Sequence, residues 1–414
     1  MSFVCFCLVF CLIFPAIDTR EELEKLREIE EELKRRKIET QERINDVEMM
    51  LVSADGGNVF LNRINSTWRE IDIINNIIAN LEILLLSRNP IAAIDLTQNL
   101  PLRQLNIDQE GVGRKIKQID LSQNTQLQTL QLIHNELTTL DLSANTKLEY
   151  LVGRNNSKLT SVEFPVFENI VHFFNFSNCD LRTVDLSNNS KIARIMLTDN
   201  PNLTSVDVSG TFQFANHLYG AVLTVFNNPS LTSLNVANTP EMTRLEANDS
   251  AISTLDVSGH PKLDVVFAYD CPNLISINAQ GAGALRALRA YWTPGMNGKE
   301  KGARESVNIN GCIRLGPTDA QAGDGKGDSQ LYLYNQKLSS LDLSGISANY
   351  PFPYNTSRMR IQNNNMSELI LPNSAAVTTT FLNNWRSVGN ATNDQYHLEG
   401  NNFGIGNLGI VKAE

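Results

Sequence analysis

One apolar frame recurs through most of the chain and restricts what it can fold into. The stretch LQTLQLIHN, residues 127–135, has leucine at its first, fourth and sixth positions and asparagine at its ninth. Copies return at a step of about 21 residues, and a stretch repeating at this length is one structural unit that buries its apolar face only against its neighbours. We therefore predict a solenoid in which each copy forms one turn of a stacked array.

The copies are regular enough for their positions to be numbered. First-frame copies begin at Leu81, Leu102, Leu127, Leu148, Val171, Ile192, Met242, Leu263 and Leu285, and another ends at Asn228. A second, shorter frame, such as LDLS or VDVS, stands between them at residues 140–143, 184–187, 206–209 and 255–258. The combined frame, LxxLxLxxN and then LxxLDLSxN, resembles the short leucine-rich repeats of internalin-like and BspA-like bacterial surface proteins.

This resemblance implies a fold and a function. The implied fold is an α/β solenoid, a leucine-rich-repeat right-handed superhelix with a curved parallel β-sheet and mostly irregular convex segments. The repeats cover residues 81–291, followed by a degenerate repeat with a glycine-rich insertion at 292–328 and irregular C-terminal repeats at 329–414. The implied function is non-enzymatic recognition at a bacterial cell surface.

The ninth position of the first frame carries a polar side chain inside an apolar pattern. Here the backbone leaves regular strand pairing, and its buried N–H and C=O groups need partners. An asparagine amide both donates and accepts hydrogen bonds, so a column of asparagines can satisfy successive turns. Asparagines fit this position at Asn89, Asn135, Asn200, Asn228 and Asn364, and cysteines at Cys179, Cys271 and Cys312. We expect these cysteines to be buried thiols without disulfides, because they lie in separate turns.

The segment before the repeats divides into three parts. Residues 1–17 form an apolar run that is long enough for a signal-peptide core and short for a membrane-spanning helix. It lacks a basic start and has an imperfect cleavage site, so three readings stay open: a cleaved leader, a lipoprotein segment acylated at Cys7 or Cys11, and a buried apolar arm. Either of the first two places the protein outside the cell, on the bacterial surface or secreted.

Two helices are predicted after the leader. Residues 18–56 are rich in charge and repeat Leu26, Leu33, Thr40 and Val47 every seven residues, which predicts a charged helix with a possible coiled-coil seam. Oligomerisation through residues 20–52, a solvated stalk and packing on a neighbouring domain are all compatible with it. Residues 57–80 predict a second, amphipathic helix, which would cap the open apolar end of the first repeat.

Charge and motif searches narrow the function classes. The formal net charge of -10 argues against nucleic acid, which needs a positive surface. The GxGxxG match at residues 404–409 has no room for a following helix, and the histidines lack metal-ligand spacing. Acidic residues of the glycine-rich insertion lack the bidentate glutamate of an EF-hand. We therefore predict no enzyme activity, no cofactor and no metal.

The outward positions of the predicted strand are the third, fifth and seventh, because side chains alternate between the two faces. In a solenoid these positions line one concave face, which such arrays use for recognition. Aromatic and arginine side chains gather there, with Trp292 at the eighth position, and we predict that they bind a protein, peptide or glycan. The candidate residues are Tyr150, Phe173, Arg194, Phe226, Arg244, Phe267, Tyr269, Arg289, Tyr291, Trp292, Tyr332, Tyr334, Arg358 and Arg360.

Two alternatives remain for this face and for the whole protein. The aromatic side chains can fill the groove by packing on one another instead of contacting a ligand. The protein can also be a structural subunit of a larger surface or secreted assembly, attached through its N-terminal helix. A membrane contact is expected only through the N-terminus.

Overall fold

The computed structural model describes residues 82–88, 91–213, 220–299, 301–310, 312, 330–343, 358–370 and 396–397. Side chains are described for all of these except residues 297, 330, 358, 359, 396 and 397. The predicted apolar leader, the predicted charged helix, the predicted cap helix and most of the glycine-rich insertion lie outside the described residues. The chain forms two compact units, residues 1–170 and 171–414, which we call the first and second units.

In the first unit, the first frame forms short parallel strands, and so does the second frame. Strands built from the first frame are called front strands, and those built from the second frame are called back strands. The front strands β1 to β3 and β5 pair each with the next, and the back strands β4 and β6 pair with one another. Their bounds are Ile83–Leu85 (β1), Gln104–Asn106 (β2), Thr129–Gln131 (β3), Thr139–Asp141 (β4), Tyr150–Val152 (β5) and Ser161–Glu163 (β6).

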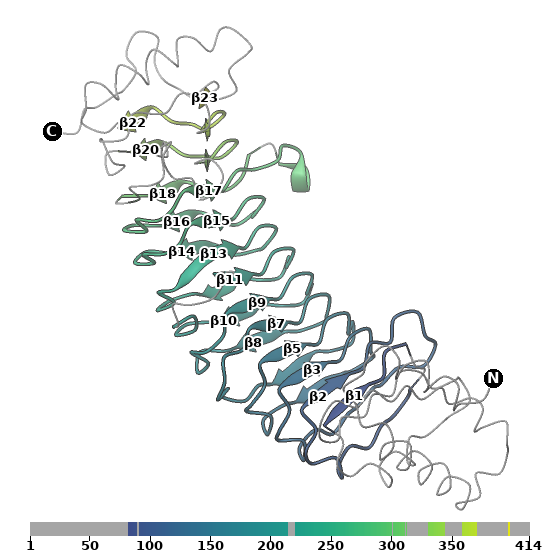
Figure 1. Cartoon of the computed structure of the whole chain (residues 1–414). Coiled ribbons are helices and arrows are strands. Elements are labelled where there is room, and N and C mark those ends of the chain that lie inside the picture. Colours follow the sequence, from purple (N-terminus) through teal and green to yellow (C-terminus); the bar gives the residue numbers. More distant parts are fainter. Residues whose placement is uncertain are drawn as a thin grey trace, which may run out of the picture. The chain divides into compact units, whose positions relative to one another are not determined.

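The second unit continues the same alternation (Figure 1). Its front strands form one parallel sheet and are Phe173–Asn175 (β7), Arg194–Met196 (β9), Ala221–Thr224 (β11), Met242–Glu246 (β13), Val265–Phe267 (β15), Ala287–Arg289 (β17), Gln330–Tyr332 (β19), Arg358–Arg360 (β21) and Tyr396–His397 (β23). Its back strands are Thr183–Asp185 (β8), Ser205–Asp207 (β10), Ser233–Asn235 (β12), Thr254–Asp256 (β14), Ser276–Asn278 (β16), Ser306–Asn308 (β18), Ser340–Asp342 (β20) and Glu368–Ile370 (β22).

The expectation of irregular segments behind the front sheet is wrong for the described turns. The second frame is itself a strand pattern of period two, and its central residue is buried between exposed neighbours in β4, β8, β14 and β20. Nor is the described part α/β, because its only helical element is the short 3-10 helix η1, Met296–Gly298. In a regular turn, such as that from Glu246 to Thr254, the connection is too short for an α-helix packed on the sheet.

The core is a column of apolar side chains from the first, fourth and sixth positions of the first frame. In the turn that opens at Leu127, Leu130 and Leu132 are also almost completely buried. Phenylalanine takes two of these positions in another turn, where the rings of Phe174 and Phe176 lie 5.2 Å apart. Each such side chain contributes roughly 1.5–3 kcal/mol by leaving water, so the repeated frame supplies most of the driving force for stacking.

The asparagine column predicted at the ninth position is confirmed for the described residues. Asn228 is fully buried and donates from its amide to the carbonyl oxygens of Leu197 (2.9 Å) and Val225 (2.6 Å). Its side-chain oxygen accepts the backbone N–H of Asn200 in the preceding turn at 2.8 Å. Buried Asn135, Asn200 and Asn364 likewise donate to backbone carbonyls of their own turn and the preceding one. Asn89 lies outside the described residues.

Two of the three cysteines belong to this column, and the third does not. Cys271 is buried and its thiol donates to the carbonyl of Ala247 at 3.3 Å, as an asparagine would, and Cys179 is buried at the equivalent position. Cys312 instead follows the back strand β18, and its thiol donates to Ala279 O at 3.0 Å. All three are free thiols. The assignment of Cys312 to the front frame was wrong because the back frame ends in a polar column of its own.

That back column was not recognised from the sequence. Its members are buried and lie five residues after the central residue of most back frames or of their equivalents: Asn99, Asn124, Asn145, Asn189, Thr211, Thr239, His260 and Cys312, with Ala282 as an apolar member. Asn145 donates to the carbonyls of Leu121 and Asn124, and His260 accepts or donates at Thr239 Oγ1, 2.9 Å away. Most turns therefore contribute one residue to each of two buried polar columns, one behind the front strands and one behind the back strands.

The aspartate of the back frame closes the turn that follows the strand. Asp141, Asp207 and Asp256 each accept the backbone N–H of the serine two residues later at 2.9 Å. The pKa of Asp141 lies below 3.8 because Ser143 donates to the charged carboxylate. For Asp207 and Asp256, burial acts to raise the pKa, but the serine and asparagine donors outweigh it and the pKa is lowered. Asn235 and Asn278 make the same turn without a charge.

Removing one asparagine from the column behind the front strands should destabilise the protein. Asn228→Leu keeps the side-chain volume but leaves two carbonyls and one N–H buried without their partner, at about 1–3 kcal/mol for each group. We expect a loss of about 3 kcal/mol in the free energy of unfolding, measured by urea denaturation. The control is Asn202→Leu, because Asn202 is exposed and bonds only to Asp180 at the surface. Equal urea midpoints for the two variants would contradict the role of the column.

The lowered aspartate pKa values predict a dependence of stability on pH. A folded pKa below 3.8 means that the unfolded chain binds protons first, so the stabilisation is present above pH 3.8 and is lost as pH falls below it. A variant with Asp141→Asn, Asp207→Asn and Asp256→Asn keeps the turn acceptor without the charge. Thermal unfolding between about pH 5 and 3 should show a smaller loss for this variant than for the wild type. Glu305→Gln, an exposed control, should follow the wild type.

Candidate functional site

The outward face of the front sheet is the candidate site. In β15 the central Val266 is buried while Val265 and Phe267 point to the other side of the sheet, as the alternation predicts. The seventh position follows two residues after the strand on that same side. The rings and guanidinium groups predicted from the sequence gather most densely in the second unit, in the turns of β13 to β21.

Three tyrosines at the seventh position form a continuous stack. The ring centroids of Tyr269 and Tyr291 lie 4.9 Å apart with planes 3° from parallel, and those of Tyr291 and Tyr334 lie 4.6 Å apart at 5°. These distances match the separation of neighbouring strands, about 4.7–4.9 Å, because β15, β17 and β19 are adjacent in the sheet. The stacking follows from placing the same residue type at the same position of three adjacent turns.

The fifth position carries a second column in which rings and guanidinium groups alternate. The order across β15, β17, β19 and β21 is Phe267, Arg289, Tyr332 and Arg360. The guanidinium carbon of Arg289 lies 4.8 Å from the Phe267 ring centroid and 5.5 Å from that of Tyr332. Arg360 lies 5.3 Å from the Tyr332 centroid. Each contact contributes on the order of 0.5–1 kcal/mol and holds the arginine in place.

The two columns contact each other and form one surface. Phe267 and Tyr269 have ring centroids 6.3 Å apart, and Tyr332 and Tyr334 have centroids 6.4 Å apart. We call this surface the aromatic–arginine grid; it consists of Phe267, Tyr269, Arg289, Tyr291, Tyr332, Tyr334 and Arg360. Arg244, from β13, adds a guanidinium 4.9 Å from the Phe267 ring centroid. Its Nε also donates to Glu246 Oε1 at 2.6 Å, so this arginine is paired with a carboxylate.

The remaining predicted face residues lie outside the grid. Phe226 is partly exposed at the seventh position of its turn, and Arg194 lies over the ring of Phe173 with 5.8 Å between guanidinium carbon and centroid. Tyr150 belongs to the first unit and is 45% exposed. Arg358 begins β21, but its side chain is outside the described residues.

Trp292 was predicted to lie on this face, and that prediction is wrong. Its side chain is 0% exposed, and its indole Nε1 donates to the carbonyl of Lys299 at 3.0 Å. Trp292 stands at the eighth position, where most other described turns from β1 to β21 turn sharply with a positive φ. In this turn an inserted segment, residues 293–303, follows instead, and the indole packs beneath it.

Positive φ at the eighth position explains another regularity of the sequence. The backbone there has φ between 52° and 62°, a region that asparagine and aspartate tolerate better than most other residues. The residues with this conformation are Arg88, His134, Asn155, Asn178, Asp199, Asn227, Asp249, Asp270, Asn335 and Asn363. The side chains of this position form a polar border along the front strands.

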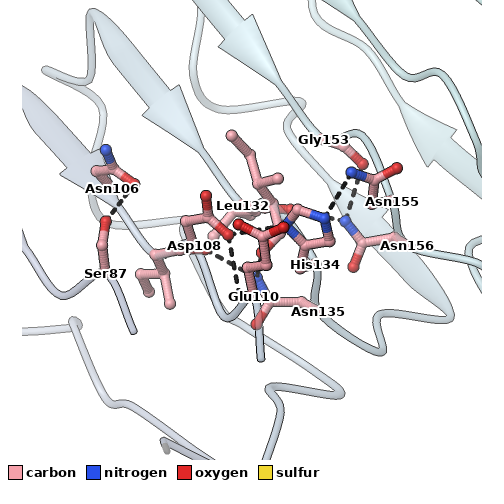
Figure 2. Close-up of polar contacts among 12 residues, drawn as sticks. Ser87, Asn106, Asp108, Glu110, Leu132, His134, Asn135, Gly153, Asn155 and Asn156 are labelled. Atoms are coloured by element: carbon pink, nitrogen blue, oxygen red, sulfur yellow. Dashed lines mark hydrogen bonds and ion pairs between the residues drawn. The ribbon is translucent and has the colours of Figure 1, made fainter. Parts of the chain in front are cut away.

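His134 shows how this border is connected in the first unit (Figure 2). Its Nδ1 lies 2.9 Å from Asp108 Oδ1, and its Nε2 lies 2.8 Å from the amide nitrogen of Asn155. Both ring nitrogens are therefore engaged by neighbouring turns. No group of three metal-binding side chains occurs in the part of the chain that the structure describes.

Directly after the inserted segment, an arginine replaces a core leucine. Arg304 stands where other turns have Leu203, Leu231 or Leu274, two residues before the back strand, and it is 1% exposed. Its guanidinium donates to the carbonyls of Ala290 and Ala268, the partners that the asparagine column would otherwise contact. Burial lowers the pKa of Arg304 to about 10, so the group stays charged at neutral pH. The sequence could have indicated that this turn is unusual, because Arg304 occupies a position that is leucine in other turns.

The insert is also held at its two ends. Asp270 accepts the backbone N–H of Thr293 at 2.6 Å and its hydroxyl at 3.0 Å. At the other end, the N–H of Gly302 donates to Asn335 O at 2.9 Å. A Cβ at position 302 would overlap the side-chain amide of Gln336, which would have to move to accept it.

Burial shifts the ionisation of the tyrosine stack. The pKa of Tyr291 is raised from 10.0 to about 12 by desolvation and by the neighbouring Tyr334, Tyr269 and Asp270. Desolvation likewise raises the pKa of Tyr269, aided by Asp249, and that of Tyr334. The three phenols therefore remain neutral hydrogen-bond donors well above neutral pH.

Comparisons with known proteins find similarity in structure. No family model matches the chain, and no curated protein matches it in sequence. The functional domain of InlJ from Listeria monocytogenes, which includes a cysteine ladder, is 18% identical over 76% of this chain, with a TM-score of 0.36. This chain covers 64% of that domain, less than two thirds of its length.

Two further structures have comparable similarity. A leucine-rich-repeat protein of Leptospira interrogans is 14% identical, with a TM-score of 0.36, and the match covers 82% of this chain and 91% of that one. The leucine-rich-repeat ectodomain of the Arabidopsis thaliana receptor kinase GASSHO1/SCHENGEN3 is 14% identical, with a TM-score of 0.38, over 84% of this chain and 41% of that one. InlJ and the Leptospira protein are bacterial leucine-rich-repeat proteins, the class that the sequence resembles.

Among the residues that the structure describes, no helix has both the length and the apolar composition needed to span a membrane.

The raised phenol pKa values can be measured directly. Ultraviolet absorbance of phenolate should rise with pH in both the wild type and Tyr291→Phe, and the difference between the two curves should have its midpoint near 12. Circular dichroism at each pH would confirm that both proteins stay folded. A difference curve centred at the ordinary tyrosine value of 10.0 would contradict the buried stack.

Proposed function

We propose that this protein is a non-enzymatic recognition protein of the bacterial cell surface, which binds a protein, peptide or glycan through the outward face of its front sheet. The single observation that carries the proposal is the aromatic–arginine grid. Aromatic and arginine side chains are enriched at the centres of interfaces, where they supply most of the binding energy. Export, by a cleaved leader or a lipid anchor, is part of the proposal.

The packing of the grid supports binding rather than only structural filling. Tyr269, Tyr291 and Tyr334 remain partly exposed although they stack on one another, as do Phe267 and Arg289. Stacked rings and cation–π contacts hold these side chains in one conformation before any partner arrives. A preorganised surface loses little side-chain entropy on association, which favours affinity.

The chemistry of the grid favours binding over catalysis. A general base must be able to take a proton near neutral pH. The phenols of the grid have raised pKa values, and guanidinium groups stay protonated, so neither can serve as that base. Both groups are instead stable hydrogen-bond donors.

The proposal is tested by a binding screen of the full chain against immobilised proteins, peptides and polysaccharides. The test variant combines Phe267→Ala, Tyr269→Ala and Tyr291→Ala, and the control variant combines Thr254→Ala and Ser276→Ala on the back strands of neighbouring turns. We expect a ligand whose binding falls at least about 100-fold in the test variant, because several anchors are lost together, and stays unchanged in the control.

Thermal unfolding must show that the test variant is still folded before binding is compared. Binding that resists the front substitutions would refute the front face as the site. Absence of any ligand, together with a defined oligomer that dissociates when residues 1–57 are removed, would favour the assembly subunit instead.

A further inference from the structure

The ring faces of the grid are largely closed by the protein itself. Tyr291 is stacked between Tyr269 and Tyr334. Phe267 receives guanidinium groups from Arg244 and Arg289, which come from the strands on its two sides. Sugars bind aromatic side chains mainly through open ring faces. The grid instead offers ring edges, hydroxyl groups and the edges of guanidinium groups.

The groups that remain for a ligand are mainly donors. The phenols are neutral, and Arg289 and Arg360 carry positive charge. The carboxylates near the Tyr269 end already have donors: Glu246 is bonded to Arg244, Asp249 to Asn248 and Asp270 to Thr293. In the described part of the chain, Arg360 has no carboxylate within ion-pair distance. A ligand that complements these donors supplies acceptors and negative charge, above all at Arg360.

The arginines are held in a way that suits carboxylates. A guanidinium group whose flat face lies on a ring keeps its N–H groups along its edge, and this fork matches the two oxygens of a carboxylate. Arg289 lies between two rings and Arg360 over one. The same surface contains the apolar edge of Phe267, which is partly exposed, so a complementary ligand combines carboxylates with apolar groups.

The inserted segment adds an edge to this surface. It begins directly after Tyr291 and Trp292, and Figure 1 shows its helix η1 extending beyond the front strands beside β17. It also carries Lys299 and Lys301, and the Lys301 ammonium donates to Asn365 Oδ1 at 2.9 Å. An extended ligand that crosses the strands would meet this edge next to the tyrosine stack.

We infer that the aromatic–arginine grid binds an extended, acidic segment of a partner protein, with its carboxylates on Arg289 and Arg360 and its apolar side chains on the ring edges. The inference rests on the proposed function and narrows it to one ligand class. Charge complementarity carries it, because the ring-held guanidinium groups of Arg289 and Arg360 supply positive charge that a ligand carboxylate matches. A sulfated polysaccharide would satisfy the charges but would leave the ring edges without apolar partners.

The experiment measures binding of fluorescent peptides to the full chain by anisotropy. The probes are synthetic peptides of about ten residues, long enough to cross several strands, in which glutamate alternates with leucine, phenylalanine, tyrosine or proline. Matched probes carry glutamine in place of glutamate. We expect at least one glutamate peptide to bind about 10-fold or more tightly than its glutamine counterpart, and to weaken as salt is raised.

Three variants locate the site. Arg289→Gln and Arg360→Gln should each weaken the glutamate peptide about 10-fold, because each removes one carboxylate partner. Arg182→Gln makes the same change at an exposed arginine outside the grid and should have no effect. Tyr291→Phe keeps the ring stack and removes one donor hydroxyl, so a weakening of about 3-fold in a variant with unchanged thermal stability would separate recognition from folding.

The inference is overturned if glutamine peptides bind as tightly as glutamate peptides, if Arg360→Gln binds the peptide normally, or if dextran sulfate binds the grid in preference to every peptide. It is also overturned, while the proposed function stands, if the screen finds a neutral or basic ligand that depends on Phe267, Tyr269 and Tyr291. If no ligand depends on the front face, both fail.

Discussion

The structure depends on satisfying the backbone carbonyls that each turn buries where it leaves a front strand. These groups cannot reach water, and the chain pairs them with a side chain from the ninth position, most often an asparagine. The requirement is for a donor at one place, not for one residue type. Cys271 meets it with a thiol, and Arg304 meets it from a different sequence position. The column is thus a geometric constraint that several side chains can fulfil.

The sequence predicted those features that repeat and missed those that occur once. Parallel front strands, the buried asparagines and the gathering of rings at outward positions follow from registered periodicity, which averages over many copies. Trp292, Cys312 and Arg304 each occur in a turn that departs from the frame, so their places depend on tertiary packing. The back strands were missed for another reason: three-residue strands separated by turns resemble irregular chain until their partners in neighbouring turns are known.

In the candidate site, too, some features could be predicted from the sequence and others depend on tertiary packing. Register alone placed Phe267, Tyr269 and Tyr291 on one face of the sheet. It could not show that the rings would close on each other and on the arginines, because that depends on side-chain torsions across neighbouring strands. Most side chains of the grid pack on one another and also remain partly exposed. The two readings of the aromatic residues, filling the groove and meeting a partner, are compatible.

The strands β17 and β19 lie side by side in the sheet although the chain between them runs from Arg289 to Gln330. The neighbouring strands β15 and β17, by comparison, are joined by one ordinary turn, so the connection from β17 to β19 is longer and still returns to the same register. The cost of closing a loop grows only with the logarithm of its length. Residues could therefore be gained or lost here during evolution while the tyrosine stack keeps its spacing. The connection beside the aromatic–arginine grid can therefore change in length while the grid itself stays the same.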